Sequence, residues 1–195
     1  MSLSKYTITE GNVLSDMLLS NGIHDLESLA RYLKTLPYGR NANKTDLSLI
    51  LTEGMGTCSS KHAFFKAVAM ENNFEDIKLV LSIFKMNGKN TPGIGNLILK
   101  ANLDHIPEAH CYLKIENQVY DLTHPSSSFE KIKDDVMHEQ FILPDNIGQY
   151  KIDFHKAYIS RWISENGILL TSQDIWRLRE ECIKALSQQT PDMGT

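Results

Sequence analysis

The segment HCYLKIENQVYDLT, residues 110–123, constrains the fold most, because its side chains alternate in character as they do in a β-hairpin. A two-residue turn at Glu116–Asn117 would place Ile115 opposite Gln118. Side chains alternate between the two faces of a strand, and opposed residues share a face. One face then holds a nearly all-apolar set: Cys111, Leu113, Ile115, Tyr120 and Leu122. We expect this face to pack against the core.

The other face of the hairpin carries the more polar residues, among them His110 and Asp121 as diagonal neighbours. An Asp beside an imidazole fixes its tautomer and stabilises the imidazolium. Cys111 falls on the opposite face, so we do not expect it to take part in chemistry at His110.

The segment GMGTCSSKHAFF, residues 54–65, predicts a tight turn that leads into a helix beginning at Thr57 or Cys58. A helix N-terminus and a nearby imidazolium both lower the pKa of a thiol, so Cys58 is a candidate nucleophile. Its backbone N–H would then point at the oxygen of an attacked carbonyl. Taken alone, Cys58 also fits a buried structural thiol. We expect Lys61 either to face solvent or to help lower the pKa of the Cys58 thiol. We expect His62 either to lie on the helix surface or to be packed inside the protein.

The order of elements predicts an α+β fold. Helices are expected over residues 25–36, 46–53 and 58–72, a strand over 77–86, the hairpin, a short strand over 139–143, and helices over 153–165 and from 172. The nucleophile-bearing core helix would pack on an antiparallel sheet, with the last helices as a C-terminal extension over about 150–190. We expect residues 1–195 to form one domain.

Composition narrows the classes of partner. The 195 residues carry a formal net charge of -4 and have no long run of Lys and Arg, which argues against a nucleic-acid partner. No apolar run has membrane-spanning length, and the first ten residues do not resemble a signal peptide. Three cysteines without a CxxC pair indicate free thiols in a reducing compartment, so we expect a cytoplasmic protein that does not bind membranes.

The sequence predicts no cofactor and no metal, since it has no EF-hand pattern and no acidic loop cluster. One alternative is a zinc site built from Cys58 and His110 with His105 or His124, because thiolate and imidazole suit zinc. No CxxC or HxxxH pair supports that site.

Three motifs, GTCSSKHAFFKAVAMEN, AHCYLKI and VYDLTHP, resemble in their order those of the transglutaminase-like superfamily, which has a papain-like fold. The segment LKTLPYGRN also resembles the one that leads into the Cys motif of prokaryotic members. The resemblance covers roughly residues 30–125. It implies a triad in which Cys58 attacks a carbonyl, His110 moves the proton and Asp121 orients His110.

The sequence departs from the family in three respects. The spacing between His110 and Asp121 is tight, so the hairpin is short. Many members have a Trp directly after the His, where this chain has Cys111 and then Tyr112. The oxyanion-hole side chain is not identifiable, and the candidates for the oxyanion hole or substrate cleft are Asn41, Tyr38 and Gly56.

The superfamily includes transferases, peptidases, amide hydrolases and inactive members. The resemblance therefore implies thiol-dependent acyl chemistry on a peptide, a protein or a small amide, and we favour hydrolysis because nothing points to an amine-donor site. The alternative is an inactive transglutaminase-like domain that binds a peptide or protein in the same cleft. The sequence leaves the oligomeric state open.

Overall fold

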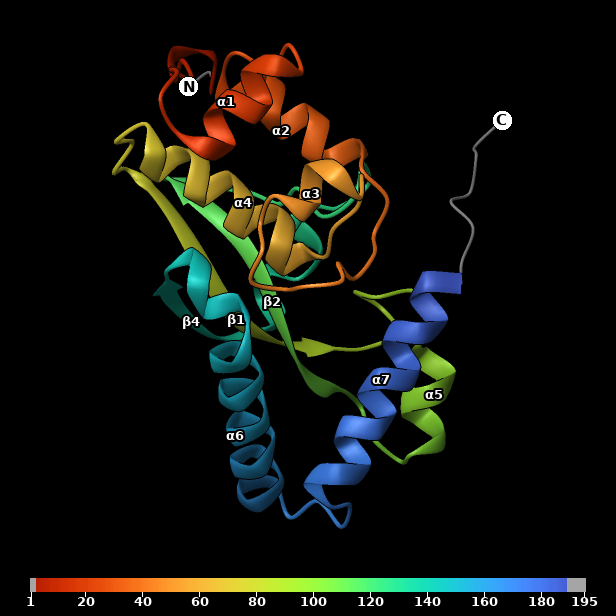
Figure 1. Ribbon diagram of the computed structural model, residues 1–195. Coiled ribbons are helices and arrows are strands. Elements are labelled where there is room, and N and C mark those ends of the chain that lie inside the picture. Colours follow the sequence, from red (N-terminus) through yellow and green to blue (C-terminus); the bar gives the residue numbers. More distant parts are fainter. Residues whose placement is uncertain (1–2, 189–195) are drawn as a thin grey trace. The chain divides into compact units, whose positions relative to one another are not determined.

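The computed structural model describes residues 3–188, which form seven α-helices and a four-stranded antiparallel sheet (Figure 1). The strand order is β3-β2-β1-β4. The strands are β1 (Ile77–Met86), β2 (Ile106–Ile115), β3 (Gln118–Tyr120) and β4 (Val136–Ile142). The helices are α1 (Val13–Ser20), α2 (Leu26–Thr35), α3 (Leu49–Thr52), α4 (Cys58–Glu71), α5 (Gly95–Lys100), α6 (Gln149–Asn166) and α7 (Ser172–Gln188). The predicted α+β class is confirmed.

Helix α2 begins and ends where its sequence predicts. Asp25 is the N-cap, and its side chain accepts a hydrogen bond from the backbone N–H of Ser28 at 2.7 Å. The helix ends before Pro37, and Leu36 is already extended, as the residue before a proline prefers to be. Short 3-10 turns lie at Leu3–Lys5, Phe129–Lys131, Lys133–Asp135 and Pro144–Ile147.

The hairpin of β2 and β3 has the predicted register. Ile115 pairs with Gln118 and Leu113 with Tyr120 across a two-residue turn, in which Glu116 has a positive φ of 53°. Cys111, on the apolar face, is fully buried. On the other face Tyr112 is also fully buried, because it packs against Phe129 and hydrogen-bonds Glu139. The face of the hairpin that we expected to be more polar is therefore covered by Phe129 and Glu139 around Tyr112.

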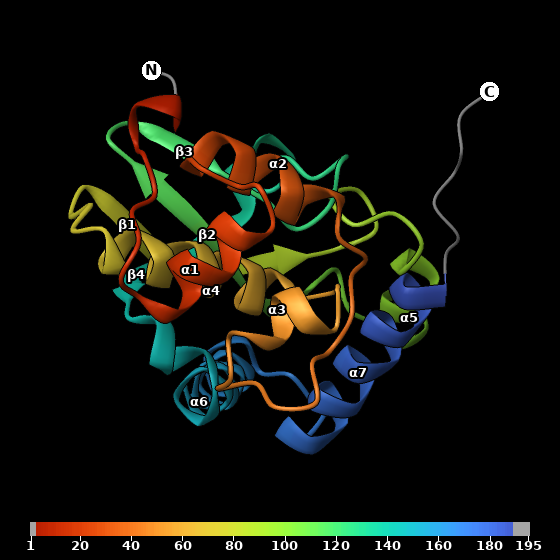
Figure 2. The same cartoon turned by 45° about the horizontal axis from the view of Figure 1, so that its top comes forward.

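Helix α4 is the central helix of its part of the fold. Eleven of its 14 residues are buried, so it has no polar face turned to solvent over most of its length. Helices α1, α2 and α3 pack against it (Figures 1 and 2). A helix buried on every side must find an internal partner for each polar side chain that it carries.

The described chain divides into two compact units. The first comprises the described part of Met1–Leu81 with His110–Phe129 and Glu139–Gln149. The second comprises Ser82–Ala109, Glu130–His138 and the described part of Tyr150–Thr195.

The second unit contains a buried ion pair. Arg179 of α7 binds Glu108 of β2 through two hydrogen bonds of 2.7 and 2.9 Å. Burial alone would raise the pKa of Glu108, but the guanidinium of Arg179 lowers it below its usual value. Helix α5 also packs on α7.

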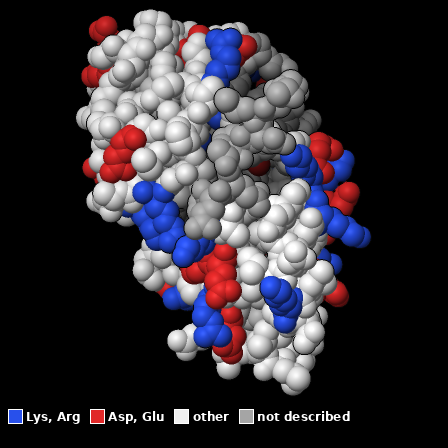
Figure 3. All heavy atoms as spheres, turned by 90° about the vertical axis from the view of Figure 1, so that its right-hand side faces the viewer, with Lys and Arg blue, Asp and Glu red and all other residues white. Residues whose placement is uncertain are grey.

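Charges of both signs are interspersed on the face shown in Figure 3, where blue and red side chains lie next to one another. Arg177 and Asp174, one helical turn apart on α7, form an ion pair at 2.9 Å. Within residues 3–188, no helix combines the length and the apolar character needed to cross a membrane.

Candidate active site

The turn before Cys58 depends on a glycine because two chain segments meet there. The backbone N–H of Gly56 donates to Pro37 O at 3.2 Å, and Gly39 N–H donates to Gly56 O at 3.3 Å. A Cβ added at Gly56 would lie 2.6 Å from Ile50 Cδ1 and 2.9 Å from Lys61 Cγ. The segment around Tyr38 is therefore held directly against the residues that lead into the Cys motif.

A capping box fixes the start of α4. Thr57 is the N-cap, and its hydroxyl accepts from the backbone N–H of Ser60 at 3.2 Å. In return, Ser60 Oγ accepts from the backbone N–H of Thr57 at 2.9 Å. Cys58 is the first residue of the helix and is only 8% exposed. Its thiol thus lies at the positive end of the helix dipole, as predicted.

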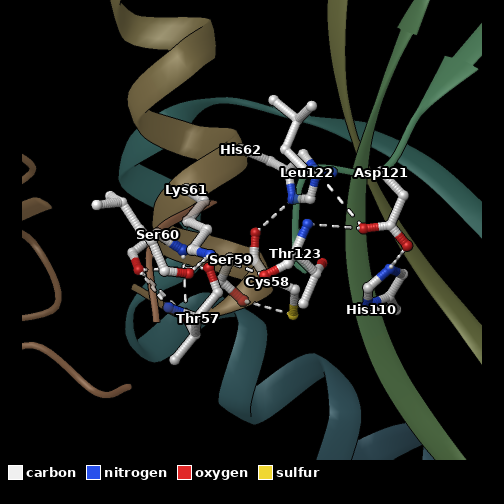
Figure 4. A network of polar contacts seen from close by, with 11 residues as sticks. Thr57, Cys58, Ser59, Ser60, Lys61, His62, His110, Asp121, Leu122 and Thr123 are labelled. Carbon is white, nitrogen blue, oxygen red and sulfur yellow. Dashed lines mark hydrogen bonds and ion pairs between the residues drawn. The ribbon is translucent and has the colours of Figure 1, made fainter. Parts of the chain in front are cut away.

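His110 lies between Asp121 and Cys58 (Figure 4). Its Nε2 is 3.1 Å from Asp121 Oδ2, and its ring also lies within hydrogen-bonding reach of the Cys58 thiol. The other carboxylate oxygen, Oδ1, accepts from the backbone N–H of Thr123 at 3.0 Å. The structure brings together all three residues of the predicted triad.

The electrostatics of this group favour a charged imidazole. Burial alone would lower the pKa of His110, but the charges of Asp121 and Cys58 raise it well above its usual value. Burial alone would raise the pKa of Asp121, and the neighbouring His110 instead holds it far below its usual range. The carboxylate is therefore ionised at neutral pH, and the protonated form of His110 is favoured beside it.

His62 is a packed histidine, fully buried one turn along α4 from Cys58. Its Nδ1 lies 2.6 Å from the carbonyl oxygen of Cys58, and its Nε2 accepts from the backbone N–H of Leu122 at 2.7 Å. Burial lowers the pKa of His62 to about 4, although Asp121, whose Oδ1 is 3.9 Å from Nε2, opposes that effect. The ring is therefore neutral at physiological pH.

The expectation that Lys61 faces solvent is wrong. Its side chain is fully buried, and its ammonium group donates to Leu36 O at 2.6 Å and to Thr123 O at 2.7 Å. Burial lowers the pKa of Lys61 to about 8, while the charges of Cys58 and Asp121 oppose that effect. The second possibility, that Lys61 acts on the charge of the thiol, stays open.

The structure places Asn41 beside the turn and not at the thiol. Its amide nitrogen donates to Glu53 Oε2 at 2.9 Å and to Met55 O at 3.0 Å, so both amide hydrogens have protein acceptors. Tyr38, bridged to Gly56 and 38% exposed, lies on the segment that pairs with the turn. Neither residue is given an oxyanion-binding role by these contacts.

Thr123 carries a buried hydroxyl with no hydrogen-bond partner among the described residues. It lies beside Cys58 in Figure 4, and its backbone groups are bonded to Asp121 and Lys61. In the sequence, Thr123 stands out only as part of the VYDLTHP motif.

The other two cysteines are more deeply buried than Cys58. Within residues 3–188, Cys111 and Cys182 form no disulfide, and both are fully buried. Burial, with a smaller contribution from the charge of Glu108, raises the pKa of Cys182 to about 11, so this thiol is neutral. Cys58 is the cysteine that has a histidine and a helix N-terminus beside it.

The zinc alternative lacks a ligand cluster. Among residues 3–188, the His, Cys, Asp and Glu side chains form no group of three or more that could hold a metal ion. His124 instead bonds Ser126, with 3.0 Å between Nδ1 and Oγ, and the ring of His105 lies 5.5 Å from that of Trp162.

Comparisons with protein-family models, with curated proteins and with solved structures find no match to this chain. The case for its chemistry therefore rests on the geometry of Cys58, His110 and Asp121.

Proposed function

We propose that this chain is a cysteine-dependent acyl enzyme of the transglutaminase-like kind, with a papain-like arrangement of its core helix and hairpin. One observation carries the proposal: the His110 ring joins the Asp121 carboxylate, at 3.1 Å, to the thiol of Cys58 at the first residue of α4. A thiol, an imidazole and a carboxylate in this order are what nucleophilic catalysis by cysteine requires.

The first half of the reaction forms a thioester. The sulfur of Cys58 attacks the carbonyl carbon of an amide, the S–C bond forms, and the carbonyl electron pair moves to oxygen. The backbone N–H of Cys58, at the first residue of α4, would donate to that oxygen. When the tetrahedral intermediate collapses, the C–N bond breaks and the amine leaves with the proton of His110.

The second half returns the enzyme to its starting state. Water adds to the thioester carbonyl and gives a proton to His110, and the C–S bond then breaks. The products are a carboxylic acid and the paired thiolate and imidazolium. Asp121 keeps the same hydrogen bond to His110 throughout, so it orients the ring and balances its charge. An amine in place of water would give transfer instead of hydrolysis.

Acyl trapping tests the proposal without knowledge of the substrate. The protein is mixed with p-nitrophenyl acetate at pH 6 to 7, quenched, and mapped by peptide mass spectrometry. We expect acetyl to form on Cys58 and to turn over, whereas the fully buried Cys111 and Cys182 serve as internal controls. The variants His110→Gln and Asp121→Asn should slow acetylation by about 100-fold or more.

Two results would oppose the proposal. Acetylation of Cys58 that is no faster than that of a model thiol would indicate an inactive domain that binds a partner in the same place. Acetylation that is unchanged in His110→Gln would show that the imidazole does not serve the thiol.

A further inference from the structure

Two consecutive residues of α4 bond the segment that directly follows Asp121. Lys61 Nζ donates to Thr123 O at 2.7 Å, and His62 Nε2 accepts from Leu122 N–H at 2.7 Å. The same two side chains also bond backbone carbonyl groups near the start of α4. Lys61 donates to Leu36 O at 2.6 Å, and His62 Nδ1 lies 2.6 Å from Cys58 O. Figure 4 shows both side chains between the start of α4 and residues 121–123.

The partners of His62 fix its tautomer. The backbone N–H of Leu122 is a donor, so Nε2 must be the unprotonated nitrogen that accepts from it. Nδ1 therefore carries the hydrogen and donates it to Cys58 O. If Nε2 were protonated, its N–H would point at the backbone N–H of Leu122, and the hydrogen bond between these two groups would be lost. Only one protonation state of His62 satisfies both contacts.

The segment held in this way is the one that positions the carboxylate. The pairing of β2 with β3 ends at Leu113 and Tyr120, so Asp121 lies just beyond the strand ladder. From there the chain is bonded to α4 through Leu122 and Thr123. Thr123 N–H in turn donates to Asp121 Oδ1, while Oδ2 faces His110. The orientation of the carboxylate toward His110 thus depends on bonds that originate in α4.

We propose that Lys61 and His62 form a clamp that holds Asp121 in register with Cys58, which makes both of them positioning residues for the triad. This inference rests on the proposed function. Cys58 comes from a helix and His110 with Asp121 from a hairpin, so a small slip between the two would separate the reacting groups. Lys61 also has an electrostatic effect. Its buried ammonium group interacts with the charges of both Cys58 and Asp121, and its positive charge favours the ionised form of each.

Four variants and two matched controls test the clamp. His62→Ala removes both bonds of the ring, whereas His62→Gln keeps an acceptor near the Nε2 position and His62→Asn keeps a donor near Nδ1. Lys61→Met keeps much of the side-chain volume without the charge. Lys66→Met, a buried lysine of the same helix, and His155→Gln, a buried histidine bonded to Pro107 O in the other unit, are the controls.

The readout is the pH profile of Cys58 alkylation by iodoacetamide, followed by peptide mapping, with circular dichroism as the check on folding. We expect His62→Ala and Lys61→Met to slow alkylation at pH 6 about tenfold, which corresponds to a rise of about one unit in the apparent pKa of the thiol. His62→Gln and His62→Asn should recover part of the loss, and both controls should stay within about twofold of the unmodified protein. Folded His62→Ala and Lys61→Met variants with an unchanged profile would overturn the clamp.

A second measurement needs no variant and no reactive thiol. Nitrogen-15 NMR of the imidazole groups in the unmodified protein reports the tautomer of His62 directly. We expect a neutral ring with the hydrogen on Nδ1 at pH 6, and a ring that is protonated or carries its hydrogen on Nε2 would overturn the clamp. If the unmodified Cys58 alkylates like an ordinary thiol while His62 shows the expected tautomer, the proposed function fails and the clamp stands as a structural device.

Discussion

Acid should destabilise the protein through one buried side chain, His62. The ring is neutral in the folded protein because burial lowers its pKa to about 4, whereas the unfolded chain has the ordinary value near 6.5. Between these two values the unfolded state binds a proton that the folded state does not, so the free energy of unfolding falls as the pH falls. The values lie about 2.5 pH units apart, and each unit is worth about 1.4 kcal/mol, so the full loss is about 3–4 kcal/mol.

Urea unfolding at pH 7, 6, 5 and 4.5 measures this loss, with His62→Gln as the reference that cannot titrate at this position. Burial also lowers the pKa of His105 and His155, so these two rings add to the acid sensitivity of both proteins, and the difference between the two proteins isolates His62. Between pH 7 and pH 5, the unmodified protein should lose about 2 kcal/mol more than the variant. Equal losses in both proteins would refute the assignment of a neutral, doubly bonded His62.

Three stability predictions follow from single contacts, each read out by urea unfolding. Thr57→Ala removes the N-cap of α4 and should cost about 1 kcal/mol, with Thr57→Ser as the control that keeps the hydroxyl; an equal cost for Ser would contradict the cap. Gly56→Ala places a Cβ 2.6 Å from Ile50 Cδ1 and should cost about 1–3 kcal/mol, so a variant of unchanged stability would contradict the packing. Arg179→Met leaves the carboxylate of Glu108 buried without its partner and should lower the free energy of unfolding by about 3–5 kcal/mol. The double variant Arg179→Met with Glu108→Leu should regain most of that stability. If the losses of the two single variants add up in the double variant, the pairing is contradicted.

The hairpin was predictable because its faces are distinguished by side-chain type. Alternation along residues 110–123 fixed which residues face the core, and a two-residue turn fixed the register that pairs Ile115 with Gln118. That register predicts that His110 and Asp121 share a face, and the distance from His110 Nε2 to Asp121 Oδ2 is 3.1 Å. The start of α4 was equally accessible, since a Thr precedes the helix.

The surroundings of Cys58, His110 and Asp121 were not predictable, because they depend on how completely α4 is buried. Lys61 and His62 look like surface residues in a helix pattern, and local sequence does not show that helices pack around them. Their spacing gives a partial signal, since His62 is four residues after Cys58 and so lies on the same side of the helix. Tyr112 is a second case, because its burial depends on Phe129 and Glu139, which lie far along the chain.

The central claim is that Cys58 and His110 form a thiolate and an imidazolium at neutral pH, and the rate of iodoacetamide alkylation at Cys58 as a function of pH tests it most directly. A free thiol has a pKa of about 8.5, so it reacts slowly at pH 6. The account predicts that Cys58 alkylates at least about tenfold faster than a model thiol at pH 6, and that His110→Ala abolishes this advantage. A profile for Cys58 that matches the free thiol, or one that His110→Ala leaves unchanged, would contradict the account.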